Sequence, residues 1–109
     1  MNGVTEDGPV DSVTKDGRYL IIKGRRWRAT DPEIPDDIAA ALRKALMAAR
    51  RDVGTALRKD EDPAPARSRV QLAKVALGER GTPWWEQTPE QRRERWEQGL
   101  RDVRNASAG

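Results

Sequence analysis

The chain has 109 residues and contains neither cysteine nor histidine, which excludes disulfide bonds, thiolate metal sites and histidine-based acid–base catalysis. Its 21 basic and 18 acidic residues give a net charge of +3, and its aromatic residues are four tryptophans and one tyrosine. At this length we expect one small domain of modest stability, for which pairing with a partner or with a second copy would add buried surface.

The N-terminal segment and the lack of long apolar stretches bear on location. Residues 1–16 are polar and acidic, have no apolar segment of the kind found in signal peptides, and are expected to form a disordered arm. No segment approaches the roughly 20 apolar residues of a membrane-spanning helix. We therefore expect a cytoplasmic protein without membrane association, with a single domain over residues 17–104 and a tail at residues 105–109.

Residues 18–29 have the pattern of a two-stranded β-hairpin. The β-prone run 19–22 and the return run 25–28 are separated by Lys23-Gly24, which is a suitable two-residue turn. This register places Leu20, Ile22, Arg25 and Trp27 on one face, and Tyr19, Ile21, Arg26 and Arg28 on the other. Because isolated hairpins are marginal in water, we expect the Leu20/Ile22/Trp27 face to dock on the rest of the domain.

Three helices are predicted next, at about residues 35–59, 66–80 and 88–103. The first begins at Pro35 with two aspartates after it and carries an apolar stripe at 3.6-residue spacing. A short acidic loop joins it to the second, so these two should form an antiparallel helical hairpin. The third begins with a capping pattern at Thr88. The predicted fold is mainly α, with an N-terminal two-stranded hairpin docked on an antiparallel helical hairpin plus a C-terminal helix.

Three blocks of sequence, in this order, resemble the signature of a family of short actinobacterial proteins of unknown function. The blocks are GRRWRATDP at residues 24–32, LMAARR at residues 46–51, and AKVALGERG with PWWE over residues 73–86. The resemblance covers roughly residues 18–97 and implies a shared fold, without an activity or catalytic residues. Some relatives continue into a small winged-helix-like domain, which we expect this chain to lack. Some carry the label "biopolymer transporter Tol", which no transmembrane or periplasmic feature of this sequence supports.

The carboxylates are the remaining candidates for catalysis or metal binding. Asp31, Glu33, Asp36 and Asp37 cluster at the start of the first helix, where capping and dipole interactions favour acidic residues in any case. The acidic loop at residues 60–62 has the composition of a solvated linker. No phosphate-binding glycine loop, nucleophile elbow or metal-ligand spacing is present. We therefore expect no enzymatic activity, no metal, no cofactor and no small-molecule ligand.

The basic residues of the first helix favour a binding function. Lys44, Arg51 and Arg58 recur every seven positions opposite the apolar stripe, and none is followed by an acidic residue four positions later in that helix. A helix face of one sign suits nucleic-acid phosphates, whereas a merely solvated face more often alternates in sign. Solvated surface, or a face neutralised by the acidic arm, remains an alternative explanation.

Arg26 and Arg28 lie beside Tyr19 in the hairpin, a pairing that can hold phosphate and stack a base. The first hypothesis is therefore a module that contacts nucleic-acid phosphates without reading the sequence. Its candidate residues are Arg26, Arg28, Arg43, Lys44, Arg50, Arg51 and Arg58.

The tryptophans support an alternative hypothesis. Adjacent Trp84 and Trp85 cannot both enter one core if the chain is extended there, so one is expected to be exposed as an interface anchor. Trp96 and Leu100 lie on the narrow apolar stripe of the third helix. The alternative is therefore a protein-interaction or homodimerising module that uses Trp84, Trp85, Trp96 and Leu100, although core packing explains the same residues.

Overall fold

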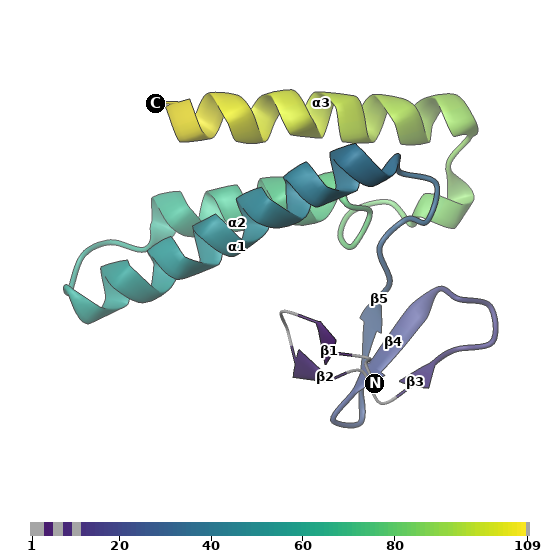
Figure 1. The fold of residues 1–109 in the computed structure, drawn as a ribbon, viewed down its shortest axis with the longest axis horizontal. Coiled ribbons are helices and arrows are strands. Elements are labelled where there is room, and N and C mark those ends of the chain that lie inside the picture. The colour runs from purple at the N-terminus through teal and green to yellow at the C-terminus, as the bar shows by residue number, and fades with distance from the viewer. Residues whose placement is uncertain (1–3, 6–7, 10–11, 109) are drawn as a thin grey trace.

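The computed structural model describes residues 4–5, 8–9 and 12–108, and over these it is mainly α-helical with a small antiparallel sheet near the N-terminus (Figure 1). The predicted fold class is therefore confirmed. The long helices are α1 (Asp36–Arg58), α2 (Ala64–Ala76) and α3 (Pro89–Ala108), and a 3-10 turn at Trp84–Glu86 precedes α3. Helices α1 and α2 form the predicted hairpin, and α3 packs mainly on α2. Within the described residues, no helix is both long and apolar enough to cross a membrane.

The hairpin has the predicted register. Strand β4 (Tyr19–Ile22) pairs antiparallel with β5 (Arg25–Arg28), so that Leu20 lies opposite Trp27 and Tyr19 opposite Arg28. The turn residues Lys23 and Gly24 have φ angles of 51° and 77°. Positive φ at both central positions is the geometry of the type I′ turn, whose twist matches that of the two strands.

The sheet has a third strand that the sequence did not predict. Strand β3 (Ser12–Val13) pairs with β4. It leads into a turn in which the Thr14 hydroxyl donates to Asp16 and accepts from the backbone N–H of Tyr19. Residues 12–16 are thus structured, in contrast to the predicted arm, and the short strands β1 (Val4–Thr5) and β2 (Gly8–Pro9) pair with each other. The rest of that predicted arm lies outside the described residues.

Two helix ends differ from the prediction because of local backbone geometry. Helix α2 ends at Ala76 rather than near residue 80, since Gly78 adopts a φ of +82° and closes the helix with bonds from the following amides. Helix α3 continues to Ala108, so most of the predicted tail at residues 105–109 is helical. That segment contains no proline and its only glycine is the last residue, so nothing in it stops the helix earlier.

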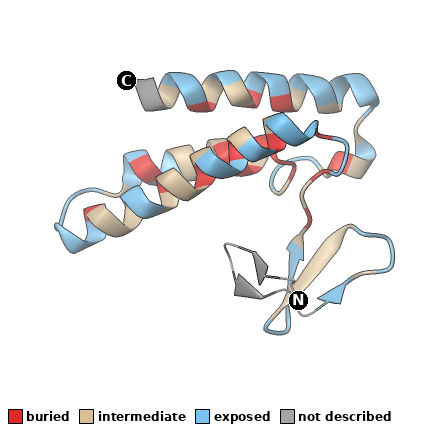
Figure 2. Cartoon of the chain, viewed as in Figure 1, coloured by how far each residue is buried: buried red, intermediate tan, exposed pale blue. Residues whose placement is uncertain are grey.

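The core lies between the three helices, on the sides that face one another (Figure 2). Helix α3 approaches α2 closely at Gly99, where an added Cβ would lie only 2.2 Å from the Cβ of Ala76. Strands β3, β4 and β5 are half-buried or exposed. The main buried residues are Ile34, Ala39, Leu42, Leu46, Ala73, Ala76, Leu77, Trp96 and Val103.

Candidate nucleic-acid interface

The sheet is attached to the helices through Trp85. The ring of Trp85 packs edge-on against Tyr19 with centroids 5.5 Å apart, and the guanidinium of Arg18 lies 4.8 Å from the Trp85 ring. Arg28 donates a hydrogen bond of 2.7 Å to the carbonyl oxygen of Gly81. The face that carries Leu20, Ile22 and Trp27, which was expected to dock, therefore does not make the main contact with the helices. That contact is made by the opposite face, through Tyr19 and Arg28. Trp27 remains 41% exposed.

The segment between β5 and α1 fixes the direction in which the sheet leaves the helices. The indole N–H of Trp84 donates to the carbonyl oxygen of Ala29 at 3.0 Å, and the Thr30 hydroxyl donates to Glu79 at 2.7 Å. The backbone N–H of Asp31 donates to the carbonyl oxygen of Leu77 at 3.0 Å. These bonds hold β5 close to the end of α2, so the sheet and α2 face each other across a defined gap.

Asp31 is the only acidic residue with a buried side chain among the described residues, and two arginines of α3 satisfy it. Arg92 Nε donates to Asp31 Oδ2 at 2.9 Å, and Arg95 Nη2 donates to the same oxygen at 2.6 Å. Burial alone would raise the pKa of Asp31. The hydrogen bonds from Arg92, Arg95 and the backbone of Glu33 outweigh burial and hold that pKa below its usual value.

This arrangement gives Asp31, alone among the four clustered carboxylates, a structural role. The oxygens of Asp31 point at guanidinium groups, while the side chains of Glu33, Asp36 and Asp37 are exposed. In the part of the chain that the structure describes, no group of three potential ligands is placed to hold a metal ion.

The basic residues of α1 divide into two sets. Lys44, Arg51 and Arg58 are exposed along the side opposite Leu42 and Leu46, and Arg43 is exposed beside them. We call these four residues the basic row. Within the described residues, none of the four forms a salt bridge. Asp52, the acidic residue nearest to Arg51 in α1, is instead paired with Arg69 of α2 at 2.7 Å.

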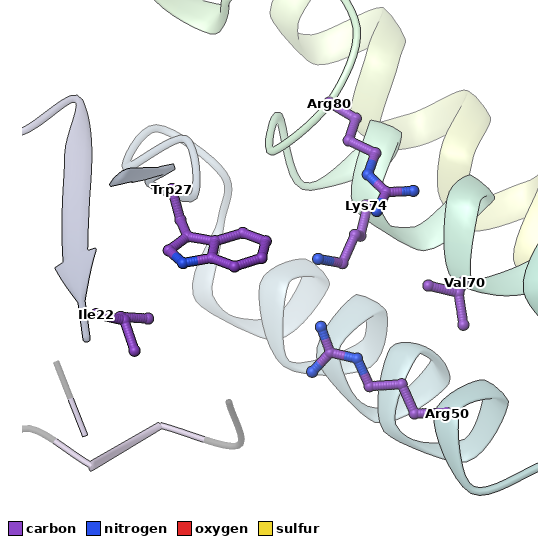
Figure 3. Close-up of a pocket in the computed structure, with 6 residues that line it drawn as sticks. All are labelled: Ile22, Trp27, Arg50, Val70, Lys74 and Arg80. Atoms are coloured by element: carbon purple, nitrogen blue, oxygen red, sulfur yellow. The ribbon is translucent and has the colours of Figure 1, made fainter. Parts of the chain in front are cut away.

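Arg50 is the basic residue of α1 that is placed differently. It is half-buried and points into a cleft between α1, α2 and the sheet (Figure 3). The cleft has a volume of about 400 Å³, and an adjoining hollow of about 380 Å³ continues it along the two helices past Arg67. None of the described lining residues of either is acidic. We call the two together the basic groove. Its lining residues are Ile22, Trp27, Arg50, Val53, Arg67, Val70, Lys74 and Arg80.

The structure places the two candidate arginines of the sheet differently. The guanidinium of Arg26 on β5 lies 4.3 Å from the ring centroid of Tyr19 on β4, so the predicted basic–aromatic pair forms between these two strands. Arg28 contacts Gly81 and Trp85 and is therefore engaged in holding the sheet in place. Arg28 is not available as a free phosphate contact in this arrangement.

The tryptophans predicted as interface anchors are mostly inside the fold. Trp84 and Trp96 are 8% and 7% exposed, and Leu100 packs against the core. Trp85 is half-buried between Tyr19, Arg18 and Trp84. Trp84 and Trp85 avoid competing for one core because the 3-10 turn points their rings in different directions, with 85° between the ring planes. The exposed surface expected at this corner is thus largely used for packing.

Sequence reasoning missed Arg67, Lys74, Arg80 and the cleft-facing position of Trp27. A signal was present for two of them: Arg67 and Lys74 are seven positions apart, the same spacing as in the basic row. The sequence does not predict that these residues meet in one cleft, because that depends on the distance between the sheet and α2. Comparisons with protein-family models, with curated proteins and with solved structures found no match to this chain. The resemblance to an actinobacterial family therefore stays a prediction.

Proposed function

We propose that the protein is a non-catalytic module of the cytoplasm that binds nucleic acid through non-specific phosphate contacts. The observation that supports this most directly is the basic row on α1, whose four cations are exposed and form no salt bridge within the described residues. Exposed cations of one sign on a rigid helix supply the sequence-independent attraction that dominates non-specific binding.

The geometry of the row suits an extended polyanion. Residues seven positions apart on a helix lie about 10.5 Å apart along its axis, so Lys44, Arg51 and Arg58 span about 21 Å. A backbone carrying one phosphate per nucleotide can therefore meet several of these cations at once. If all four residues of the row neutralise phosphates, log K should fall with log salt with a slope of about −3 to −4.

A charge-neutral variant of the row tests the proposal. The variant replaces Arg43, Lys44, Arg51 and Arg58 with glutamine, which keeps helix propensity while it removes four positive charges. Binding of a fluorescently labelled 30-nucleotide DNA is followed by anisotropy at several salt concentrations. We expect the variant to lose at least tenfold in affinity at low salt and most of the salt slope.

A second variant with the same change in net charge is the matched control. It replaces Lys15 in the β3–β4 turn and the exposed arginines Arg93, Arg101 and Arg104 of α3 with glutamine. We expect its affinity to stay within about threefold of the unmodified protein. A flat salt response of the unmodified protein, or equal losses in the two variants, would overturn the proposal.

The alternative of a protein-interaction or homodimerising module has weaker support. Two of its four anchor residues, Trp84 and Trp96, are buried, and Leu100 packs against the helical core. A dimer that uses them would have to open the fold first. Sedimentation of the unmodified protein over a range of concentrations separates the two ideas, since a constant monomer mass argues against the alternative.

A further inference from the structure

The cleft at the sheet end of the basic groove combines an exposed aromatic ring with several cations. The indole of Trp27 extends from β5 into the space between the sheet and the helices, and Arg50, Lys74 and Arg80 converge on the same space from α1, α2 and the segment after α2 (Figure 3). Lys74 Nζ lies 5.7 Å from the Trp27 ring centroid. Ile22 and Val70 supply apolar lining.

These features are complementary to a ligand that carries an aromatic ring and an anion a short distance apart. A simple inorganic anion would use the cations and leave the indole without a role, whereas an apolar peptide would make no use of the cations. A paired base in a duplex keeps both faces stacked within the helix and cannot reach a side chain in a cleft. A nucleotide of a single strand presents both an open base face and a phosphate, and a cleft of about 400 Å³ lies in the range that holds small ligands.

We propose that this cleft binds one unpaired nucleotide of a single-stranded nucleic acid, with its base stacked on Trp27 and its phosphate near Arg50, Lys74 and Arg80. This inference rests on the proposed function and refines it by naming the substrate class as single-stranded. Arg25, which is exposed and lies 5.2 Å from the Trp27 ring centroid, moves aside when the base stacks.

The neighbouring part of the groove gives the strand a path away from the cleft. The adjoining hollow shares Arg50, Val70 and Arg80 with the cleft and adds Arg67, which lies one heptad before Lys74 on α2. Arg50 and Lys74 also make other interactions within the chain, so the phosphate shares these two groups with the protein. Arg80 lines both parts of the groove and is exposed, and its Nη1 donates to Gln71.

An abasic oligonucleotide separates stacking from charge, because it keeps every phosphate and lacks the bases. The test compares a labelled ten-residue oligothymidylate with an abasic oligonucleotide of equal length and with a duplex of equal length. For the unmodified protein we expect the oligothymidylate to bind at least about fivefold more tightly than the abasic strand, as one stacked base on an aromatic side chain would give. Quenching of tryptophan fluorescence on binding should accompany this preference.

Substitutions at Trp27 test which ring is responsible. Trp27→Ala should reduce the preference for the oligothymidylate over the abasic strand to about one, while abasic binding stays unchanged. Trp27→Tyr, which keeps a ring, should retain most of the preference.

Two further variants are controls. Val13→Ala, which shortens another exposed apolar side chain of the same sheet, should have no effect on the binding of either ligand. Arg80→Gln should weaken both ligands equally. Circular dichroism confirms that each variant is folded.

The results distinguish the failure of this inference from the failure of the proposed function. Equal affinity of the unmodified protein for the oligothymidylate and the abasic strand, together with a steep salt dependence, would overturn base stacking and leave phosphate binding intact. A preference that survives in Trp27→Ala, or duplex binding as tight as the oligothymidylate, would also overturn it. Absence of salt-dependent binding to all three ligands would overturn both proposals.

Discussion

The carboxylate of Asp31 and the guanidinium of Arg95, 64 residues apart in the sequence, meet at 2.6 Å with the side chain of Asp31 fully buried. Arg95 also donates through Nε to the carbonyl oxygen of Ala76 at 3.2 Å, at the end of α2. The pair therefore joins the segment before α1, the end of α2 and the start of α3. Since Asp31 follows β5 closely, the same pair sets where Trp27 stands relative to α2.

Replacing Asp31 with asparagine should destabilise the protein strongly. Arg92 and Arg95 would lose their shared partner while their side chains stay mostly buried, and breaking one member of a buried ion pair typically costs about 3–5 kcal/mol. Chemical denaturation followed by circular dichroism measures the loss. Glu33→Gln, an exposed carboxylate two residues away, should change stability by less than about 0.5 kcal/mol. Equal effects of the two substitutions would contradict the assigned role of Asp31.

The same carboxylate predicts how stability depends on pH. The pKa of Asp31 is held below its ordinary value of 3.8 in the folded state, so its contribution is present in full above 3.8 and is lost as the pH falls through the folded-state pKa. The difference in unfolding free energy between the unmodified protein and Asp31→Asn should therefore shrink on acidification. Urea denaturation at a series of acidic pH values measures it. A difference in unfolding free energy that widens toward low pH would contradict a lowered pKa of Asp31 in the folded state.

Replacing each of two helical glycines with alanine should change the stability of the protein in opposite directions. Gly99→Ala places a Cβ 2.2 Å from the Cβ of Ala76 in the contact between α2 and α3, so the helices must separate. The cost of such overpacking, about 1–3 kcal/mol or more, should exceed the gain of about 1 kcal/mol in helix propensity. Gly54→Ala meets only the flexible end of Arg58 at 3.3 Å and should stabilise α1 by about 0.5–1 kcal/mol. Melting temperatures that rise for both variants would contradict this packing.

The elements were predictable where the chain carries a local periodic signal. The alternation around Lys23-Gly24 indicates both the hairpin and its register, and the 3.6-residue stripe of α1 gives that helix to within one residue at each end. Strand β3 was not predictable, because two residues carry no period and its pairing depends on the turn that Thr14 stabilises. The end of α2 at Ala76 was missed because Gly78 and Gly81 both take a positive φ, and the sequence does not reveal which of the two closes the helix.

The candidate site was predictable only where it lies on one element. The basic row follows from spacing along a single helix, so Lys44, Arg51 and Arg58 are exposed as expected. The basic groove draws Trp27, Arg50 and Lys74 from three elements, and its existence depends on the contacts of Trp84 and Asp31 that set the gap. Long-range contacts of that kind leave no pattern in a single sequence.

Removing an acidic partner near the basic row should strengthen polyanion binding. Asp52→Asn breaks the ion pair with Arg69, and because both side chains are partly exposed the loss in stability should stay below about 1 kcal/mol. The released guanidinium can then contact phosphate, which should steepen the salt slope by up to about 0.9 and raise the affinity several-fold at low salt.

Glu94→Gln makes the same change in net charge at a position that lies beside Thr82, Glu86 and Gln91, in a depression lined by no residue of α1 or α2 among those described. If local charge beside the row determines binding, Glu94→Gln should change the affinity by less than twofold under conditions where Asp52→Asn strengthens it. The measurement is the same anisotropy titration of a labelled 30-nucleotide DNA at low and moderate salt. Equal gains for the two variants would mean that the overall charge of the chain, rather than the row on α1, attracts the polyanion.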